Sequence, residues 1–519
     1  MSPSSASAPP ANWPSPVALE PYDEANAELL RAVAPAGYTP PTPHARYHLV
    51  VIGAGTAGLV SAAIAASLGA RVALVERHMF GGDCLNFGCV PSKALIRSAR
   101  AWRDAATAAT DFAGPQVRGT GDFGAVMERL RVLRAQLSEA DSVERFAGLG
   151  VHVFLGEARF TSRESVAVGD TTLRFRRAII ATGARASVPP IPGLADTPYD
   201  TNETIFSLTD LPARLVVIGG GPIGAELAQA FARLGSDVAL VHADDRILPR
   251  DDEDAAGIVA RVMERDGVCI SNGARIESVA HDGREFTVTY SSGGVSTTAR
   301  AERLLVATGR APNTEGLALD QAGVDRGKSG ITVDDRFRTS NSRILAIGDV
   351  SSTLQFTHVA DAQARLAVPN ALFFGLGGGR NSRLVVPRVT YTAPEVAHVG
   401  LTPEEAGEKG EQVETLRIEL ASNDRSVLEG DTAGFLKVFL RKGSDHILGA
   451  TLVAAHAGEM IGEMGVAMTH GLGLGKLGKT IHAYPTQSDV FRRAADTWRR
   501  GRLTPLAQRI FAMWFRIFS

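Results

Sequence analysis

Two segments of the chain repeat the same order of apolar and polar positions. Each begins with a short apolar run, passes through a glycine-rich turn into a helical pattern, and ends with a second apolar run. In the first segment the apolar runs are residues 46–52 and 71–75, and residues 59–68 are predicted to form the helix between them. In the second segment the predicted strands are residues 214–218 and 237–241. This strand–helix–strand order predicts parallel sheets and an α/β fold.

The glycines of the two turns have the spacing of a dinucleotide-binding fingerprint. The two turns contain Gly53, Gly55 and Gly58, and Gly219, Gly221 and Gly224. The first glycine permits a tight turn, the second lets a pyrophosphate approach the backbone, and the third lets the helix pack on the strand. The N-terminus of the helix offers unpaired N–H groups to the phosphates. Two such turns in register predict two Rossmann-like dinucleotide-binding domains.

The residue that ends the second strand differs between the two segments. Glu76 and His242 each lie 23 residues after the first glycine of their turn. A carboxylate at this place accepts hydrogen bonds from ribose hydroxyls and repels a 2′-phosphate. A histidine, with Arg246 four residues later, favours the 2′-phosphate of NADPH. The sequence therefore favours NADPH over NADH, the alternative being that His242 is a neutral surface residue and Arg246 a solvated one.

Two of the three cysteines lie close together just after the first segment. Cys84 and Cys89 are five positions apart, and in a regular helix their Cα atoms would be about 7.5 Å apart along the axis. That exceeds the ~7 Å limit for a disulfide, so a bond would need the distorted backbone that Gly88 permits, and it would be reducible. The alternatives are two buried free thiols or part of a metal site, but the chain has no Cys or His cluster with metal-ligand spacing. Cys269 is predicted to be an apolar strand residue packed in the second dinucleotide-binding domain.

Composition narrows the class of protein. The 519 residues carry 54 Lys and Arg against 56 Asp and Glu, which gives no electrostatic footprint for nucleic acid. Three cysteines are too few for the disulfide framework of a secreted fold. The sequence has no signal-peptide pattern and no run of the ~18 apolar residues that a membrane span needs. We therefore expect a soluble, cytoplasmic, multidomain protein.

The cysteine motif identifies a family. Cys84-Leu-Asn-Phe-Gly-Cys89-Val-Pro-Ser-Lys93 resembles the redox motif of the FAD-dependent pyridine nucleotide-disulfide oxidoreductases. Further motifs follow in the order of that family, namely Ala181-Thr-Gly183, Ala307-Thr-Gly-Arg310-Ala-Pro-Asn313, Ile347-Gly-Asp349 and Tyr391-Thr-Ala-Pro-Glu-Val-Ala. The resemblance covers about residues 46–500. It implies FAD in the first domain, NAD(P)H in the second, and a C-terminal α+β domain that forms a homodimer whose partner chain completes each active site.

The resemblance divides residues 46–500 into domains, and the composition of the two ends adds a proline-rich extension and an aromatic tail. The predicted parts are a largely disordered extension with one short helix (1–44), an FAD-binding domain in two pieces (45–195 and 310–387), an NAD(P)H-binding domain (196–309), a dimerisation domain (388–501) and an amphipathic aromatic tail (502–519). The short helix is expected to run from Tyr22 to Arg31.

Several residues acquire roles from this resemblance. Cys89 would be the thiol next to the flavin and Cys84 the outer thiol that meets the substrate. Lys93 and Glu226 match an ion pair beside the flavin N5, and Asp349 would contact the ribityl chain. The other cofactor-binding positions that the resemblance implies are Glu76, on the adenosine ribose, and Ala158, Thr182, Gly183, Gly309 and His358.

The chain departs from the family pattern near its end. Disulfide-reducing members carry a histidine directly before a Pro-Thr pair and a glutamate four residues after that proline, and this dyad moves the proton of a thiol. Here Tyr484 and Asp489 occupy these two positions. A phenol of pKa ~10 is a poor base at neutral pH, and a well-placed base contributes about 10²–10⁴ in rate. His482, two residues upstream, is predicted to be non-catalytic.

The tyrosine disfavours lipoamide and glutathione as substrates and is similar to the arrangement in mercuric reductases. A soft metal ion held by two thiolates needs no proton shuttle. The sequence thus predicts an enzyme that passes electrons from NAD(P)H through FAD to the Cys84–Cys89 disulfide and on to Hg(II) or another soft metal or thiol-reactive oxidant. It lacks the C-terminal vicinal cysteine pair of typical mercuric reductases.

Two other functions remain open at this stage. One is a dihydrolipoamide dehydrogenase with an altered base, and the other is a flavin redox sensor or electron-transfer partner docked through its C-terminal tail. For the tail, residues 506–519, a helix packed on the protein's own or a partner's surface is favoured over an interfacial membrane helix.

Overall fold

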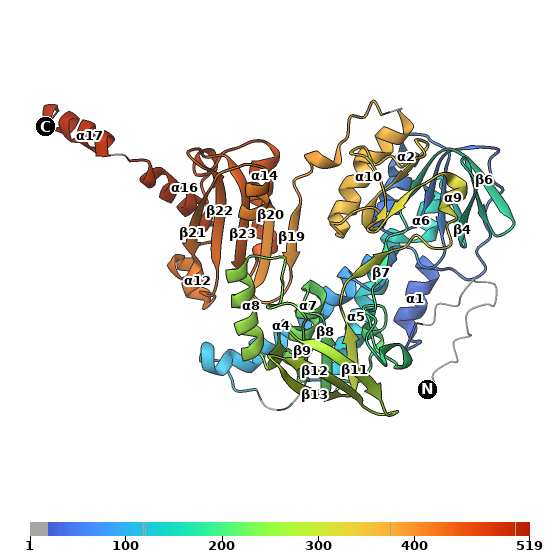
Figure 1. Ribbon diagram of the computed structural model, residues 1–519, viewed down its shortest axis with the longest axis horizontal. Coiled ribbons are helices and arrows are strands. Elements are labelled where there is room, and N and C mark those ends of the chain that lie inside the picture. The colour runs from blue at the N-terminus through green and yellow to red at the C-terminus, as the bar shows by residue number, and fades with distance from the viewer. Residues whose placement is uncertain (1–18, 118, 120, 374, 504, 519) are drawn as a thin grey trace. The chain divides into compact units, whose positions relative to one another are not determined.

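The computed structural model describes residues 19–117, 119, 121–373, 375–503 and 505–518, which form two compact units (Figure 1). Unit 1 contains the described parts of residues 1–105, 118–243 and 274–384. Unit 2 contains those of residues 106–117, 244–273 and 385–519.

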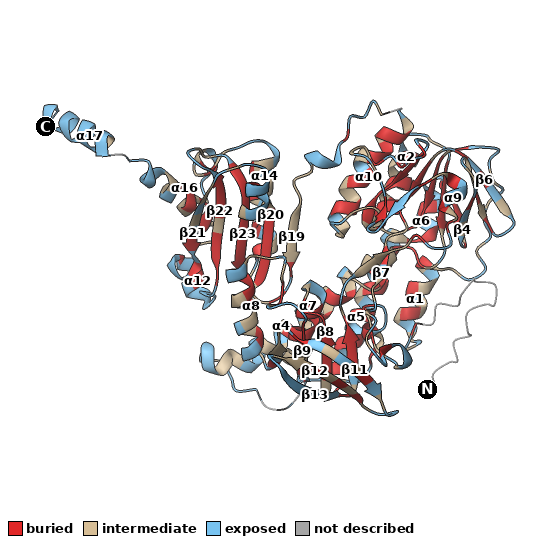
Figure 2. Ribbon diagram, in the orientation of Figure 1, coloured by how far each residue is buried: buried red, intermediate tan, exposed pale blue. Residues whose placement is uncertain are grey.

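The first sheet of unit 1 carries the first glycine turn. Its seven strands are β1 (Tyr47–Ile52), β2 (Val72–Glu76), β3 (His152–Leu155), β4 (Ala158–Ser162), β5 (Ser165–Val168), β6 (Thr171–Ile180) and β18 (Ile344–Ala346). Their order is β3-β2-β1-β6-β5-β4, with β18 also paired to β6. β1 runs parallel to β2 and β6, and it is almost wholly buried, as a parallel strand covered on both faces must be (Figure 2). Helices α2 (Thr56–Ser67) and α10 (Thr357–Leu372) pack together and share one core with β1.

The second sheet of unit 1 carries the second glycine turn. Strands β8 (Arg214–Ile218), β9 (Asp237–Val241) and β14 (Arg303–Val306) are parallel, with β8 in the middle. Helix α7 (Pro222–Arg233) follows the turn. The antiparallel strands β11 (Arg275–His281), β12 (Phe286–Ser292) and β13 (Val295–Ala301) share its apolar core. The predicted α/β class and both strand–helix–strand frames are therefore confirmed.

Unit 2 is built on an antiparallel sheet. Its strands are β19 (Pro387–Thr390), β20 (Glu395–Gly400), β21 (Val413–Glu419), β22 (Phe435–Arg441) and β23 (Ile447–Ala454), in the order β19-β20-β23-β22-β21. Helices that share its core are α13 (Ala457–Met460), α14 (Gly462–Thr469), α15 (Leu474–Leu477) and α16 (Asp489–Gly501). Helices α8 (Glu253–Arg265), α11 (Pro403–Glu408) and α12 (Asp424–Glu429) and strand β10 (Val268–Ser271) also belong to this unit. The α+β character predicted for the C-terminal part is confirmed.

The N-terminal segment contains the one short helix that the sequence predicted. Residues 1–18 lie outside the described part of the chain, but α1 (Glu24–Val33) buries Leu29 and Val33 completely in the core of unit 1. It packs against α5 (Phe123–Ser138), whose Arg131 Nε lies 2.5 Å from Asp23 Oδ2. The short helix predicted from Tyr22 to Arg31 is therefore confirmed, two residues later in the chain. Its apolar face finds a partner more than a hundred residues away, which local composition does not reveal.

Candidate functional site

Cys84 and Cys89 lie on two different helices of unit 1. The short α3 (Gly82–Asn86) ends at Phe87, and α4 (Cys89–Asp111) begins after Gly88. This break is the backbone distortion that the spacing of the cysteines required, and it brings the two sulfurs within hydrogen-bonding reach. Both residues are free thiols in this structure, which corresponds to the reduced form of the pair.

The two thiols differ in acidity. The hydrogen bond from the Cys84 thiol, followed by a 3.3 Å contact with Thr357 Oγ1 and the charge of Lys93, lowers the pKa of Cys89 to about 6. The same hydrogen bond, together with burial, raises the pKa of Cys84. The pair therefore holds one negative charge at neutral pH, on the sulfur of Cys89, and a thiolate is the reactive form of a cysteine.

Lys93 and Glu226 form an ion pair beside the thiols. Lys93 Nζ on α4 lies 2.7 Å from Glu226 Oε2 on α7. The Glu226 side chain is only 6% exposed, whereas that of Lys93 is 37% exposed. The fold thus joins two residues that are 133 positions apart in the chain, as the family resemblance implied.

The first glycine turn forms a cradle that fits a dinucleotide. A Cβ atom on Gly58 would lie 1.7 Å from the carbonyl oxygen of Gly53, so the fold itself requires a glycine there. Gly55 is different, because its backbone has φ −77° and a Cβ would meet nothing closer than 3.7 Å. Gly55 also caps α2 without any side-chain hydrogen bond, which leaves the helix N-terminus available for a phosphate.

The second turn repeats this geometry. A Cβ on Gly224 would lie 1.8 Å from the oxygen of Gly219, whereas one on Gly221 would meet nothing within 4 Å. Gly221 has φ −70° and caps α7 without a side-chain hydrogen bond. The protein alone gives no steric reason for glycine at positions 55 and 221. A ligand that approaches the backbone closely supplies one.

The residues at the ends of the second strands play equivalent parts in the two folds. The N–H of Ala54 donates to Glu76 Oε2 at 2.6 Å, and the N–H of Gly220 donates to His242 Nδ1 at 3.0 Å. Burial raises the pKa of Glu76, although the N–H groups of Ala54 and His78 oppose the shift. His242 is buried, and because its Nδ1 accepts a hydrogen bond its ring is neutral in this arrangement.

Arg246 is half-buried and bonded to the protein backbone. It lies in unit 2, where its Nη1 donates to the carbonyl oxygens of Leu248 and Asp251 at 3.0 and 3.2 Å. These two bonds tie the guanidinium to the backbone of its own loop.

Asp349 belongs to a polar group that sequence reasoning identified only in part. Arg310 Nε lies 3.6 Å from Asp349 Oδ2, and Arg310 Nη1 lies 3.1 Å from Asp83 Oδ2. Burial raises the pKa of Asp349, and the positive charge of Arg310 partly offsets this. Arg310 lies in one of the family-like motifs, but no feature of the sequence assigns it a role. Thr357 lies far from Cys89 in the chain, so no local pattern indicates their contact.

The remaining predicted cofactor positions lie on loops and element ends of unit 1. Thr182 Oγ1 donates to the carbonyl oxygen of Asn313 at 2.7 Å, and the N–H of Asn313 donates to Gly183 O at 2.9 Å. These bonds join two of the family-like motifs next to the paired strands β7 (Ala184–Ala186) and β15 (Arg310–Pro312). Ala158 begins β4, His358 stacks on Phe356 at the start of α10, and Gly309 has φ +140°.

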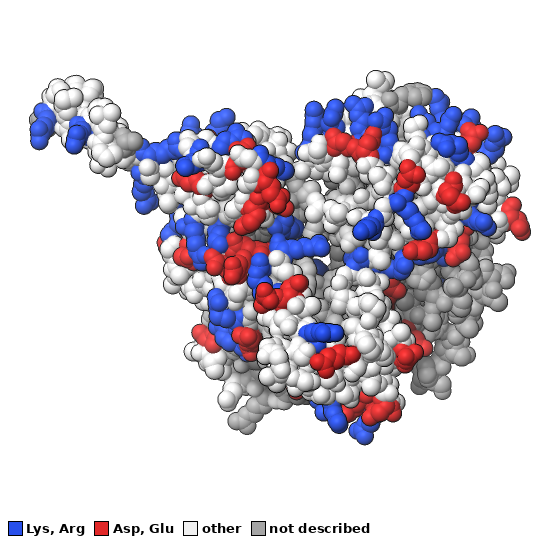
Figure 3. All heavy atoms as spheres, viewed as in Figure 1, with Lys and Arg blue, Asp and Glu red and all other residues white. Residues whose placement is uncertain are grey.

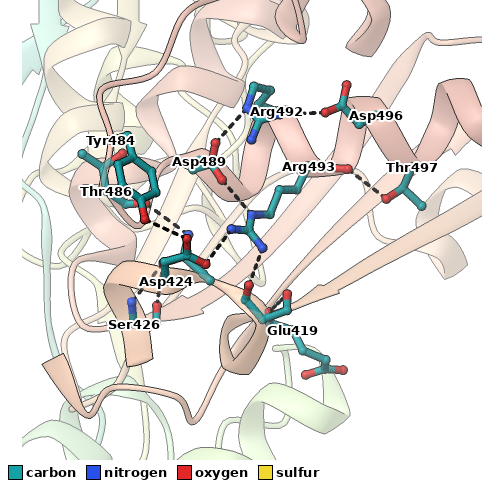
Figure 4. A network of polar contacts seen from close by, with 12 residues as sticks. Glu419, Asp424, Ser426, Tyr484, Thr486, Asp489, Arg492, Arg493, Asp496 and Thr497 are labelled. Atoms are coloured by element: carbon teal, nitrogen blue, oxygen red, sulfur yellow. Dashed lines mark hydrogen bonds and ion pairs between the residues drawn. The ribbon is translucent and has the colours of Figure 1, made fainter. Parts of the chain in front are cut away.

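Tyr484 and Asp489 do not form a dyad with each other in unit 2 (Figure 4). The hydroxyl of Tyr484 donates to Asp424 Oδ2 at 3.1 Å, and this hydrogen bond and the charge of Asp424 raise the pKa of the phenol. Asp489 instead accepts from Arg492 Nε and Arg493 Nε at 2.8 and 2.7 Å. Burial opposes ionisation of Asp489, but the two arginines outweigh it and hold its pKa below the ordinary value.

His482 has a carboxylate partner of its own. Its Nε2 lies 2.8 Å from Glu463 Oε1, and its side chain is 6% exposed. Sequence reasoning did not identify Glu463, which lies 19 residues away on α14.

Cys269 is a correction to the sequence prediction. It lies on β10 in unit 2 and its side chain is exposed, whereas the neighbouring Val268 is buried. Successive strand residues point to opposite faces, and Cys269 is on the outer face.

The two dinucleotide cradles, the paired thiols and the lysine–glutamate pair together define an oxidoreductase that joins two nucleotide cofactors to a thiol centre. The sequence profile of the family described as "Pyridine nucleotide-disulphide oxidoreductase" matches residues 47–364, and that of its dimerisation domain matches residues 386–495. The chain therefore belongs to this family, whose members bind FAD and use NAD(P)H as electron donor.

Individual relatives are moderately similar. The mercuric reductase of Bacillus cereus is 35% identical over 457 residues, which is 87% of this chain and 71% of that protein. The dihydrolipoyl dehydrogenase of Mycobacterium bovis is 34% identical over 464 residues, covering 86% and 97% of the two chains. The Cu(II) complex of the HOCl-induced flavoprotein disulfide reductase RclA from Escherichia coli superposes with a TM-score of 0.77 at 30% identity, covering 88% and 100%.

Proposed function

We propose that this protein is an NADPH-dependent, FAD-containing reductase of the mercuric reductase type, which reduces Hg(II) or another soft metal ion held by Cys84 and Cys89. The proposal rests on the hydrogen bonds and acidity of Tyr484 and Asp489, which occupy the positions of the proton-transferring dyad. The hydroxyl of Tyr484 donates a hydrogen bond to Asp424, which raises the pKa of the phenol. Asp489 accepts hydrogen bonds from two arginines.

The acidity of the two groups decides between substrate classes. Reduction of a disulfide produces a thiolate leaving group that a nearby acid must protonate, and the reverse reaction needs a base. A phenol with a raised pKa accepts no proton at neutral pH, and an aspartate with a lowered pKa has none to give. A soft metal ion accepts electrons from thiolate ligands without proton transfer, so it suits this position better.

The residues of the chain have the following roles in the proposed reaction. Gly55 and Gly221 admit the two dinucleotides to the N-termini of α2 and α7, and Glu76 orients the first ribose. When bound, FAD supplies two-electron transfer between nicotinamide and the sulfur pair. Lys93 stabilises the thiolate of Cys89 and is itself held by Glu226.

The overall reaction balances without a further reactant. The ion binds both sulfurs and displaces the proton of the Cys84 thiol. One NADPH supplies two electrons, and the products are NADP⁺, one proton and the reduced metal, Hg(0) for mercury. Cys84 and Cys89 are then free to bind the next ion.

Similar proteins support this choice of substrate. The Bacillus cereus relative is named for mercuric ion reduction, and the Escherichia coli flavoprotein RclA is described as a Cu(II) complex. The preference for NADPH is supported by the absence of a carboxylate at position 242, where an acid would repel the 2′-phosphate. Because the dimerisation domain matches residues 386–495, we further propose a homodimer, located in the cytoplasm where NADPH is supplied.

A substrate comparison with one exchanged residue tests the proposal. Purified holoprotein should reduce Hg(II) with NADPH at least about 10²-fold faster than it reduces lipoamide or oxidised glutathione. Tyr484→His should raise lipoamide turnover by about tenfold or more, because it restores a base of suitable pKa, and Tyr484→Phe should not. Fastest turnover of lipoamide with NADH by the unaltered protein would overturn the proposal.

A second function is favoured by one contact. His482 and Glu463 form a histidine–carboxylate pair, which is the arrangement that a disulfide-reducing enzyme requires. If this pair replaced the family base, the protein would be a dihydrolipoyl dehydrogenase-like enzyme, and His482→Gln would abolish lipoamide turnover. If Hg(II) reduction is the activity, the same variant should leave that rate within about twofold.

A further inference from the structure

The C-terminal helix α17 (Pro505–Ile517) exposes its apolar side chains. It follows α16 in unit 2 and contains no buried residue. Its large apolar side chains, including Trp514, Phe515 and Ile517, are each more than half exposed. The prediction was a helix packed on the protein's own or a partner's surface, and the described residues of this chain do not cover it. Such a concentration of exposed aromatic side chains marks an interaction surface.

The apolar and polar side chains of α17 separate into two faces. At about 100° per residue, Arg509 and Arg516 are seven positions apart and fall on the same narrow side of the helix. The small or polar residues Gln508 and Ala512 share that side. The opposite, wider side carries Leu506, Ile510, Phe511, Met513, Trp514, Phe515, Ile517 and Phe518.

The charge of the tail has a single sign. From Arg502 to Ser519 the sequence contains three arginines and no acidic residue. On the face seen in Figure 3, α17 shows blue and white spheres and no red. The arginines are Arg502 at the base of the tail, and Arg509 and Arg516 on the narrow side of α17.

We infer that α17 lies in the headgroup region of a membrane rich in anionic phospholipid. Its wide aromatic side would enter the boundary between headgroups and acyl chains, and its arginines would pair with lipid phosphates. The helix lies on the membrane and does not cross it. A helix of 13 residues is about 20 Å long, less than the ~30 Å hydrocarbon core, and none of the described helices is long and apolar enough to span a bilayer.

Charge complementarity selects lipid over a second copy of the chain. Two tails packed against each other would bring together three arginines from each chain with no acid from either tail. An anionic membrane surface supplies the opposite charge along the whole tail. The wide side of α17 also fits a membrane better than a coiled coil, because a coiled-coil interface uses only two apolar positions in every seven.

Vesicle binding tests this inference on the full-length holoprotein. Flavin absorbance should sediment with vesicles of phosphatidylcholine containing roughly one quarter phosphatidylglycerol at about 0.02 M salt, and much less with phosphatidylcholine alone or at about 0.5 M salt. Arg509→Gln with Arg516→Gln should weaken binding about 25-fold, roughly fivefold for each charge. Ile510→Ala with Trp514→Ala, one helical turn apart on the wide side, should weaken it at least about tenfold.

Two matched control variants distinguish vesicle binding through the tail from nonspecific binding. Arg261→Gln with Arg265→Gln removes two exposed arginines of α8 that lie four positions apart on one side of that helix. Val427→Ala with Leu428→Ala removes two exposed apolar side chains of α12. Both control proteins should bind vesicles as the unaltered protein does. All variants should keep NADPH oxidation, which distinguishes loss of membrane binding from failure of the proposed enzyme function.

Two results would overturn the inference. One is a protein that stays in the supernatant with anionic vesicles, or whose tail variants bind as well as the unaltered protein. The other is a change of oligomeric state when residues 503–519 are deleted, measured by sedimentation in the absence of lipid, because α17 would then be covered by a second copy of the chain.

Discussion

Replacing Cys84 by serine is expected to lower metal-ion turnover by about 10³-fold or more while NADPH still reduces the flavin. A serine hydroxyl is a poor ligand for a soft metal ion, so the substrate loses one of its two sulfur contacts. The serine can still donate a hydrogen bond to Cys89, which preserves the interaction that most lowers the pKa of that thiol. Steady-state turnover and anaerobic flavin bleaching, measured on the same preparation, separate the two steps.

Two further serine variants sharpen this result. Cys89→Ser should also lose turnover, and it should in addition lose any long-wavelength absorbance that a thiolate next to the flavin produces. Cys269→Ser should behave as the unaltered protein, because Cys269 is exposed on β10 in unit 2. Turnover by Cys84→Ser within about tenfold of the unaltered rate would show that the substrate takes electrons elsewhere.

Gly221→Ala is expected to raise the KM for NADPH by about 10²-fold without changing the fold. The new methyl group meets no protein atom within 4 Å, and φ −70° suits alanine, so the melting temperature should change by no more than about 2 °C. In the complex the methyl group would stand where the pyrophosphate approaches the backbone, and a displacement of about 1 Å there can cost 10²-fold. Gly55→Ala should weaken retention of FAD for the same reason.

The third glycine of the turn provides the contrasting variant. Gly224→Ala places a Cβ 1.8 Å from the oxygen of Gly219, so it should destabilise the second dinucleotide fold itself. A normal KM for NADPH in Gly221→Ala would mean that the nucleotide does not cross this turn, and the assignment of the second cradle would be wrong.

Much of the fold could be predicted because its signals are local. The glycine turns and the apolar strands on either side of them lie within short stretches of sequence, and the strand bounds agree closely with the structure. The equivalence of Glu76 and His242 also follows from their spacing. In the structure each of them accepts a hydrogen bond from a backbone N–H of its glycine turn, that of Ala54 or Gly220.

Other features depend on contacts between distant parts of the chain. The burial of Leu29 in α1 depends on α5, and the state of Tyr484 depends on Asp424, 60 positions away. Whether a strand cysteine such as Cys269 points inward is decided by which face of the strand is covered, which a single apolar run does not encode.

If electrons from NADPH leave the flavin through the Cys84–Cys89 pair, an anaerobic thiol titration will detect the two sulfurs as they are reduced. Oxidised holoprotein, unfolded before and after one equivalent of NADPH is added, should gain two titratable thiols per chain, and Cys84→Ser should gain none. If NADPH reduces the flavin but the number of titratable thiols stays constant, the Cys84–Cys89 pair does not carry the electrons.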